Sequence, residues 1–193
     1  VKLPVAAVLV ALSVTGCSRK AKYIDPDAPS KVEGTGIESR DVRAVVAQMT
    51  DAIIGSIGLA EASMPPRIAV LPVTNESRFI IDQEIFTTLI TDELVQNAKG
   101  RLAIVNRDRI DEIMREREMK RRGEVTDDGL IKGLAGVDYL LEGEVRSLSA
   151  STRRNQTDYV VIRFQLTDAE SSIVSWSSRY EMKKQGSWGV LYQ

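Results

Sequence analysis

The sequence predicts an α/β domain with a mixed sheet, in which a parallel strand–helix–strand unit precedes an antiparallel meander and helices pack on the sheet. Two observations support this prediction. Apolar runs at residues 68–73 and 102–105 flank a helical pattern, as in a βαβ unit with a right-handed crossover. Nearer the C-terminus, residues 159–166 and 174–182 alternate between apolar and polar side chains with the period of two that a strand requires.

The first predicted element is an amphipathic helix that begins at Ser39, its expected N-cap. The apolar side chains of this segment recur with a 3.6-residue period and predict one buried stripe. The stripe consists of Val42, Val45, Val46, Met49, Ile53 and Ile57.

A break at Met64-Pro65-Pro66 precedes the first strand, which spans residues 68–73 and is expected to be buried on both faces. A loop at residues 74–81 follows, and Asp82 is expected to cap the second helix, which Lys99-Gly100 ends. The face that this helix is predicted to bury contains Ile85, Phe86, Leu89, Ile90 and Val95.

The remaining elements complete the sheet. Residues 106–122 predict a charged helix whose inward residues are Ile110, Ile113 and Met114. A short helix is expected near 128–134, then a strand at 138–148. In the next strand Val160, Ile162, Phe164 and Leu166 are expected to face inward. A hairpin turn at 168–172 leads to a last strand whose inward face is expected to carry Val174, Trp176, Tyr180 and Met182.

The N-terminus has the pattern of an exported lipoprotein. Residues 3–15 form an apolar run that is too short for a transmembrane helix of roughly 20 residues but fits a signal peptide. Val14-Thr15-Gly16-Cys17 resembles a lipobox, so Cys17 is predicted to carry the lipid. We therefore expect a signal peptide at 1–16, a lipidated cysteine and flexible tether at 17–38, a globular domain at 39–186 and a tail at 187–193.

The composition argues against catalysis and against several kinds of ligand. The chain has no histidine, which is the commonest general base and metal ligand, and a single cysteine. No glycine-rich phosphate loop follows Val73. The formal net charge of -1 offers no field for nucleic acid. We expect no enzyme activity, no cofactor, no metal, no small-molecule substrate and no nucleic-acid partner.

Three stretches of the sequence resemble the LpoB family of penicillin-binding protein activators. They are Arg67-Ile-Ala-Val-Leu-Pro-Val-Thr-Asn75, Ala135-Gly-Val-Asp-Tyr-Leu-Leu-Glu-Gly143 and the segment from Phe164 to Trp176. The resemblance extends from about Ser39 to Met182. It implies a mixed sheet flanked by helices and a lipoprotein of the outer membrane, with its domain in the periplasm. It also implies that the domain binds and stimulates a bifunctional penicillin-binding protein and so regulates peptidoglycan and cell-wall synthesis.

A second family remains an alternative. The stretch from Val105 to Arg117 resembles the corresponding helix of CsgG-like outer-membrane assembly and secretion lipoproteins. Pore formation in that class would require long alternating transmembrane hairpins, and no segment of this chain has that pattern.

The candidate contact with a protein partner is the loop that follows the first buried strand, because α/β folds commonly place binding loops at this position. Its residues are Asn75, Glu76, Arg78 and Phe79. Arginine and aromatic side chains are common interface anchors. The alternative is that Phe79 packs onto the following helix. If Glu76 and Arg78 are surface groups, alanine at both positions should leave the melting temperature nearly unchanged.

Overall fold

The computed structural model describes residues 21–29, 34–56, 64–126 and 133–187, and it contains three helices and a six-stranded mixed sheet. The strand order is β3-β1-β4-β5-β6, and β2 also pairs with β4. The pairings β1–β3, β1–β4 and β2–β4 are parallel, whereas β4–β5 and β5–β6 are antiparallel. The predicted fold class is therefore confirmed. The elements are α1 (Ser39–Ser56), β1 (Arg67–Val70), β2 (Thr74–Glu76), α2 (Gln83–Ala98), β3 (Ala103–Ile104), α3 (Ile110–Arg121), β4 (Tyr139–Ser151), β5 (Asn155–Asp168) and β6 (Val174–Ser187).

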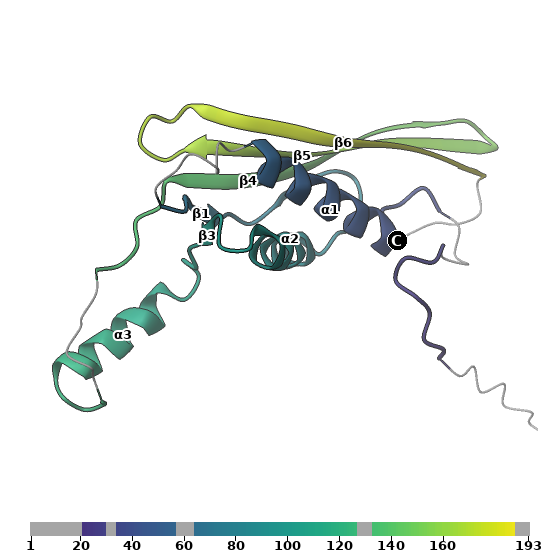
Figure 1. The fold of residues 1–193 in the computed structure, drawn as a ribbon. Coiled ribbons are helices and arrows are strands. Elements are labelled where there is room, and N and C mark those ends of the chain that lie inside the picture. The colour runs from purple at the N-terminus through teal and green to yellow at the C-terminus, as the bar shows by residue number, and fades with distance from the viewer. Residues whose placement is uncertain (1–20, 30–33, 57–63, 127–132, 188–193) are drawn as a thin grey trace, which may run out of the picture.

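The core lies between one face of the sheet and the helices α1 and α2 (Figure 1). The strand alternation predicted for β5 is confirmed, because Val160, Ile162, Phe164 and Leu166 are all buried. The intervening residues Arg163 and Gln165 point to the other face, which is polar. The Phe164 ring packs on β4 at Gly143, where a Cβ atom would lie 2.6 Å from Phe164 Cε1. Glycine at this position therefore allows the ring to lie directly on the neighbouring strand.

Helix α1 buries the predicted stripe from Val42 to Ile53, while Ile57 lies outside the described residues. Its first turn differs from the prediction. Ser39 is the first residue of the helix, and its hydroxyl donates to the Pro26 carbonyl oxygen at 2.6 Å. The Asp41 carboxylate instead accepts from the Glu38 backbone N–H at 2.8 Å, at the start of the helix.

Helix α2 confirms the predicted cap, since Asp82 accepts from the Glu84 backbone N–H at 3.0 Å. The face predicted to be buried was only partly right, because Ile85 and Val95 are exposed. The buried side chains recur at every fourth residue and form a narrow stripe toward α1 and the sheet. They are Phe86, Ile90, Leu94 and Ala98.

Helix α3 contradicts the prediction that Ile110, Ile113 and Met114 face a core. None of its residues is buried, and Ile113 and Met114 are exposed. Figure 1 shows the helix extending away from the body of the domain. Ion pairs at the surface of the helix, such as Arg121 to Glu118 at 3.6 Å, join side chains that remain about half exposed to solvent. The helix predicted near 128–134 falls mainly outside the described residues, and residues 133–137 belong to no helix or strand.

Candidate partner-binding surface

The segment predicted as a loop at 74–81 begins with a strand, because Thr74–Glu76 forms β2 and pairs in parallel with β4. The turn beyond it is held together by Asn75. The Asn75 amide nitrogen donates to the Phe79 carbonyl oxygen at 2.8 Å, and its amide oxygen accepts from the Ser77 backbone N–H at 2.9 Å. Asn75 therefore stabilises the shape of the turn.

Arg78 connects this turn to the far strand β5. Its Nε donates to Asp158 Oδ1 at 2.8 Å, and its Nη2 donates to Asp158 Oδ2 at 2.5 Å. The Asp158 side chain is fully buried, whereas the Arg78 side chain remains 44% exposed. Arg78 is therefore the cation that compensates a buried carboxylate. Because Arg78 is not a free surface group, we expect its loss to lower the melting temperature, in contrast to the prediction from the sequence.

Phe79 packs toward the interior. Its half-buried ring lies against the hydrophobic core, and the Arg78 guanidinium carbon lies 4.7 Å from the ring centroid. The ring thus shields one side of the guanidinium group from solvent and supports the Arg78–Asp158 pair. Phe79 is thus packed against the core, and its contact with the following helix stays a prediction.

Glu76 is the candidate residue that points most clearly to solvent, and it belongs to a polar network on the open face of the sheet. Its carboxylate lies 2.7 Å from Arg146 Nη2 on β4. Arg146 Nε also lies 3.2 Å from Glu144 Oε2. The Glu144 carboxylate reaches β5 through Arg163, whose Nε is 3.6 Å away. One chain of alternating charges therefore crosses β2, β4 and β5.

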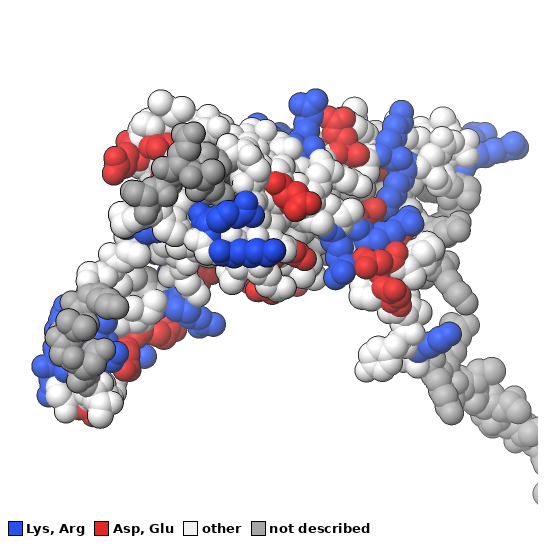
Figure 2. Space-filling model, viewed as in Figure 1, with Lys and Arg blue, Asp and Glu red and all other residues white. Residues whose placement is uncertain are grey.

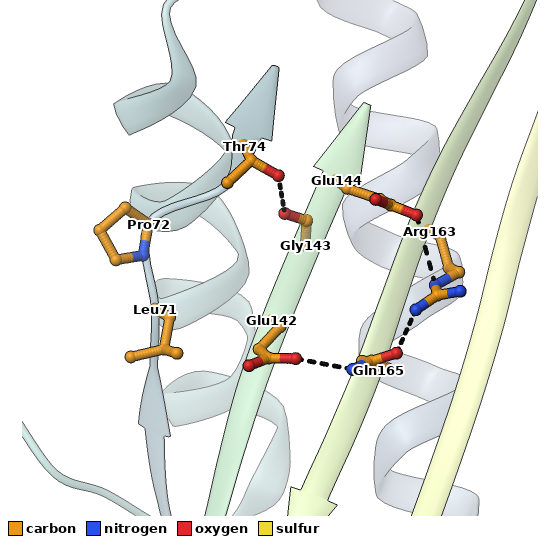
Figure 3. A pocket seen from close by; sticks show the side chains of 8 residues that line it. All are labelled: Leu71, Pro72, Thr74, Glu142, Gly143, Glu144, Arg163 and Gln165. Atoms are coloured by element: carbon orange, nitrogen blue, oxygen red, sulfur yellow. Dashed lines mark hydrogen bonds and ion pairs between the residues drawn. The ribbon is translucent and has the colours of Figure 1, made fainter. Parts of the chain in front are cut away.

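A hollow of about 210 Å³ adjoins this network. Figure 3 shows Arg163 and Gln165 pointing toward the side chains of β4, and the Gln165 amide nitrogen donates to Glu142 Oε2 at 2.6 Å. On the opposite side, the Thr74 hydroxyl donates to the Gly143 carbonyl oxygen at 3.3 Å. We call this region the polar face, comprising Glu76, Glu142, Glu144, Arg146, Arg163 and Gln165.

Exposed, paired charges give the polar face properties that suit protein recognition. Each exposed ion pair contributes only about 0–1 kcal/mol to stability, so its groups can exchange partners at little cost. In the view of Figure 2, basic and acidic side chains are interspersed over the body of the domain. Complementary charges of this kind favour specificity and correct orientation in an interface.

The sequence prediction included Glu76 but missed the other members of the polar face. The alternation of β5 already placed Arg163 and Gln165 outward. A similar alternation of Glu142, Glu144 and Arg146 in β4 could have identified the second row of charges. Their meeting with Glu76 depends on the pairing of β2 with β4, which no local pattern in Thr74–Glu76 indicates.

Two further findings concern the described residues alone. None of their helices is long and apolar enough to cross a membrane. No group of three or more histidine, cysteine, aspartate or glutamate side chains among them could hold a metal ion. Cys17 lies outside this part of the chain.

Comparison with solved structures finds several bacterial proteins that resemble this chain in part. The LpoB C-terminal domain from Salmonella enterica is 14% identical with a TM-score of 0.47, and the match covers 74% of this chain and 98% of that one. The NMR structure of Escherichia coli LpoB is 14% identical with a TM-score of 0.45, covering 95% and 84%. Lipoprotein GNA1162 from Neisseria meningitidis is 16% identical with a TM-score of 0.37, covering 63% and 84%.

Comparison with curated protein sequences finds no match. The family model described as the peptidoglycan-synthase activator LpoB, in contrast, matches residues 41–182. This match begins in the first turn of α1 and ends within β6, so it includes all or part of every described strand and helix. The chain therefore belongs to the LpoB family of peptidoglycan-synthase activators.

Proposed function

We propose that this protein is an outer-membrane lipoprotein whose periplasmic domain binds and stimulates a bifunctional penicillin-binding protein, and so regulates cell-wall synthesis. The observation that carries the proposal is the family match over residues 41–182, which spans most of the folded domain. The lipobox-like sequence that ends at Cys17 supports the anchoring part of it.

Such an activator needs no catalytic group of its own. A domain that binds the active conformation of a synthase more tightly than the inactive one shifts the synthase toward activity. The size of the stimulation is then limited by the difference between the two affinities. A rigid sheet surface with charges in fixed positions suits this task because little conformational entropy is lost on binding.

We assign the docking surface to the polar face together with the turn at residues 75–79. Glu76 and Arg146 are its most accessible charged pair, with side chains that are 56% and 57% exposed. Asn75 and Phe79 would act by holding the turn beside this pair. Arg78 would act through its pairing with Asp158.

The docking surface is tested by the double substitution Glu76→Ala/Arg146→Ala. Because the pair is exposed, the free energy of unfolding should change by less than about 1 kcal/mol. Stimulation of glycan polymerisation by a bifunctional penicillin-binding protein of the same organism should fall several-fold. The matched control is Arg122→Ala/Glu124→Ala, which removes a similarly exposed pair beyond α3 and should leave stimulation intact.

This assay tests the docking surface and the activator function separately. If the wild-type protein stimulates the synthase and the double variant does so equally well, the docking surface lies elsewhere. If the wild-type protein stimulates no penicillin-binding protein of its organism, the activator function itself is wrong.

Anchoring is tested by Cys17→Ala. The thiol of Cys17 is the only one in the chain, so its loss should abolish metabolic labelling with a radioactive fatty acid. The variant should also no longer fractionate with the outer membrane, because acyl chains supply the membrane affinity. Continued labelling together with outer-membrane fractionation would contradict the lipoprotein assignment.

A further inference from the structure

The strand β6 forms a long free edge of the sheet. Its full length pairs with β5 on one side, from Asn155 opposite Ser187 to Thr167 opposite Val174. No described strand pairs with its other side. The outward backbone N–H and C=O groups of β6 can therefore accept another extended strand. The opposite edge of the sheet, β3, is only two residues long and offers no comparable template.

The space beside this edge is open in the part of the chain that the structure describes. Two hollows of about 600 and 610 Å³ meet at Tyr180. One is bounded by Ala44 and Ala47 of α1, and the other by Gln48 of α1. Helix α1 thus lies next to the edge without covering it. Ala44 and Ala47 face the open space, together with charged side chains of α1 and of the segment before it.

We propose that β6 pairs antiparallel with β6 of a second copy of this chain, about a two-fold axis that passes through Tyr180. A closed dimer uses the same surface on both copies, and antiparallel pairing of identical edges satisfies this symmetry. The two sheets would then join into one continuous sheet. This inference does not depend on the proposed activator function.

The charges on β6 restrict the register of such a pair. Directly opposed side chains must lie on the same face, so the axis must pass through a residue. An axis through Arg179 would oppose two arginines, and one through Glu181 would oppose two glutamates. An axis through Tyr180 instead places Arg179 opposite Glu181 of the second copy, and does so twice. Arg179 and Glu181 already pair with each other within one chain, so the two intrachain pairs would come together as a cluster of four alternating charges.

Helix α1 favours Tyr180 over the next position along the strand. An axis through Met182 would also oppose unlike charges, Glu181 and Lys183. However, Ala44 and Ala47 line the same hollow as Tyr180, so an axis at Tyr180 brings the two α1 helices together at these small residues. Antiparallel packing about Ala44 and Ala47 also brings Arg40 near Asp51 of the second copy. The strand and the helix therefore fit one common axis.

Pairs of single-cysteine chains test this register. Ser177 and Lys183 are exposed, lie on the same face of β6 and are opposed when the axis passes through Tyr180. Each substitution, Ser177→Cys or Lys183→Cys, is introduced into the full chain carrying Cys17→Ala. A mixture of the two should form a disulfide-linked dimer under mild oxidation. Either chain alone should not, because its two cysteines would lie roughly 20 Å apart, well beyond the ~7 Å limit for a disulfide.

Charge reversal supplies a second measurement that does not depend on a cross-link. In sedimentation equilibrium, Arg179→Glu should raise the dimer dissociation constant about tenfold because like charges then face each other twice. The combined variant Arg179→Glu/Glu181→Arg should restore dimerisation, since the opposed charges are again unlike. Because Arg179 and Glu181 also pair with each other within one chain, rescue by the second substitution supports the dimer only if the mixed disulfide forms as well.

These experiments can overturn the proposal in three ways. The absence of a mixed disulfide in a chain that is monomeric at all concentrations would exclude the dimer. Equal cross-linking in the single-variant and mixed samples would exclude this register. Protection of the β6 edge only by an extended strand of a different protein would show that its occupant is not a second copy.

Discussion

Replacing Phe164 with alanine should lower the free energy of unfolding by about 3–5 kcal/mol, the usual loss when a large aromatic side chain is removed from a core. Phe164 is 1% exposed and is one of the largest fully buried side chains of the described chain. Its ring fills the space above Gly143, between the sheet and the helices, so its removal leaves a cavity. Gly143 has no side chain that could fill that cavity.

The adjacent residue provides the control for this experiment. Arg163 precedes Phe164 on β5 but points to the polar face, where its nearest acidic partner is Glu144 at 3.6 Å. Arg163→Ala should therefore cost well under 1 kcal/mol. Urea denaturation of both variants measures the difference directly. Equal losses at the two positions would mean that the register of β5 is wrong.

The strands could be predicted from the sequence because their hydrophobic patterns fit only one arrangement of buried side chains. Residues 159–166 alternate, so a single buried face was specified, and the structure confirms it. Apolar runs around β1 and β3 likewise indicated a parallel pair. In both regions the hydrophobic pattern alone determines which side chains must leave water.

The buried faces of the helices were harder to predict, because the apolar residues of one helix are compatible with more than one buried face. In α2, Ile85 and Val95 extend the apolar surface beyond the narrow stripe that the core can cover. In α3, a few apolar residues among many charges were assigned to a core that the helix does not reach. Whether a helix packs depends on the surface available to receive it, and its own sequence does not contain that information.

For the candidate site, the local sequence predicted the position of the turn but not its contacts with residues far away in the chain. The turn that contains Asn75 and Arg78 could be selected as the candidate site because it follows a buried strand. The partners of these residues could not be predicted, because Asp158 lies 80 residues from Arg78 and Arg146 lies 70 residues from Glu76. Thr74–Glu76 is also too short and too polar to have been recognised as a strand.

The buried carboxylate of Asp158 explains why Arg78 is required for stability. Burial alone would raise the pKa of Asp158, but hydrogen bonds from Arg78, Ser149 and Gln156 outweigh it. Together they hold the pKa well below its ordinary value. A group whose pKa is lowered by folding stabilises the protein above its unfolded pKa of about 3.9, and this contribution is lost as the pH falls below that value.

Arg78→Ala should therefore destabilise the domain by about 1.5–3 kcal/mol at pH 7, the usual loss when hydrogen bonds to a charged group are removed. The loss is smaller than for a fully buried pair because Arg78 is 44% exposed, and Asp158 keeps its hydrogen bonds from Ser149 and Gln156. The difference from wild type should shrink as the pH is lowered toward and below about 4, since protonation removes the uncompensated charge. Thermal or urea unfolding across this pH range measures both effects. Glu76→Ala, which breaks only an exposed ion pair in the same turn, is the matched control and should cost less than about 1 kcal/mol.

A double variant separates loss of the charge pair from loss of the arginine side chain itself. In Arg78→Ala/Asp158→Asn no charge is left buried, so the double variant should be less destabilised than the sum of the two single variants. Additive losses, or a loss at Arg78 that does not depend on pH, would mean that Arg78 stabilises the turn through its contact with Phe79 and not through Asp158. Because the Arg78 variant is expected to unfold more easily, partner binding at this turn is best measured with Glu76 and Arg146, whose removal leaves the Arg78–Asp158 pair in place.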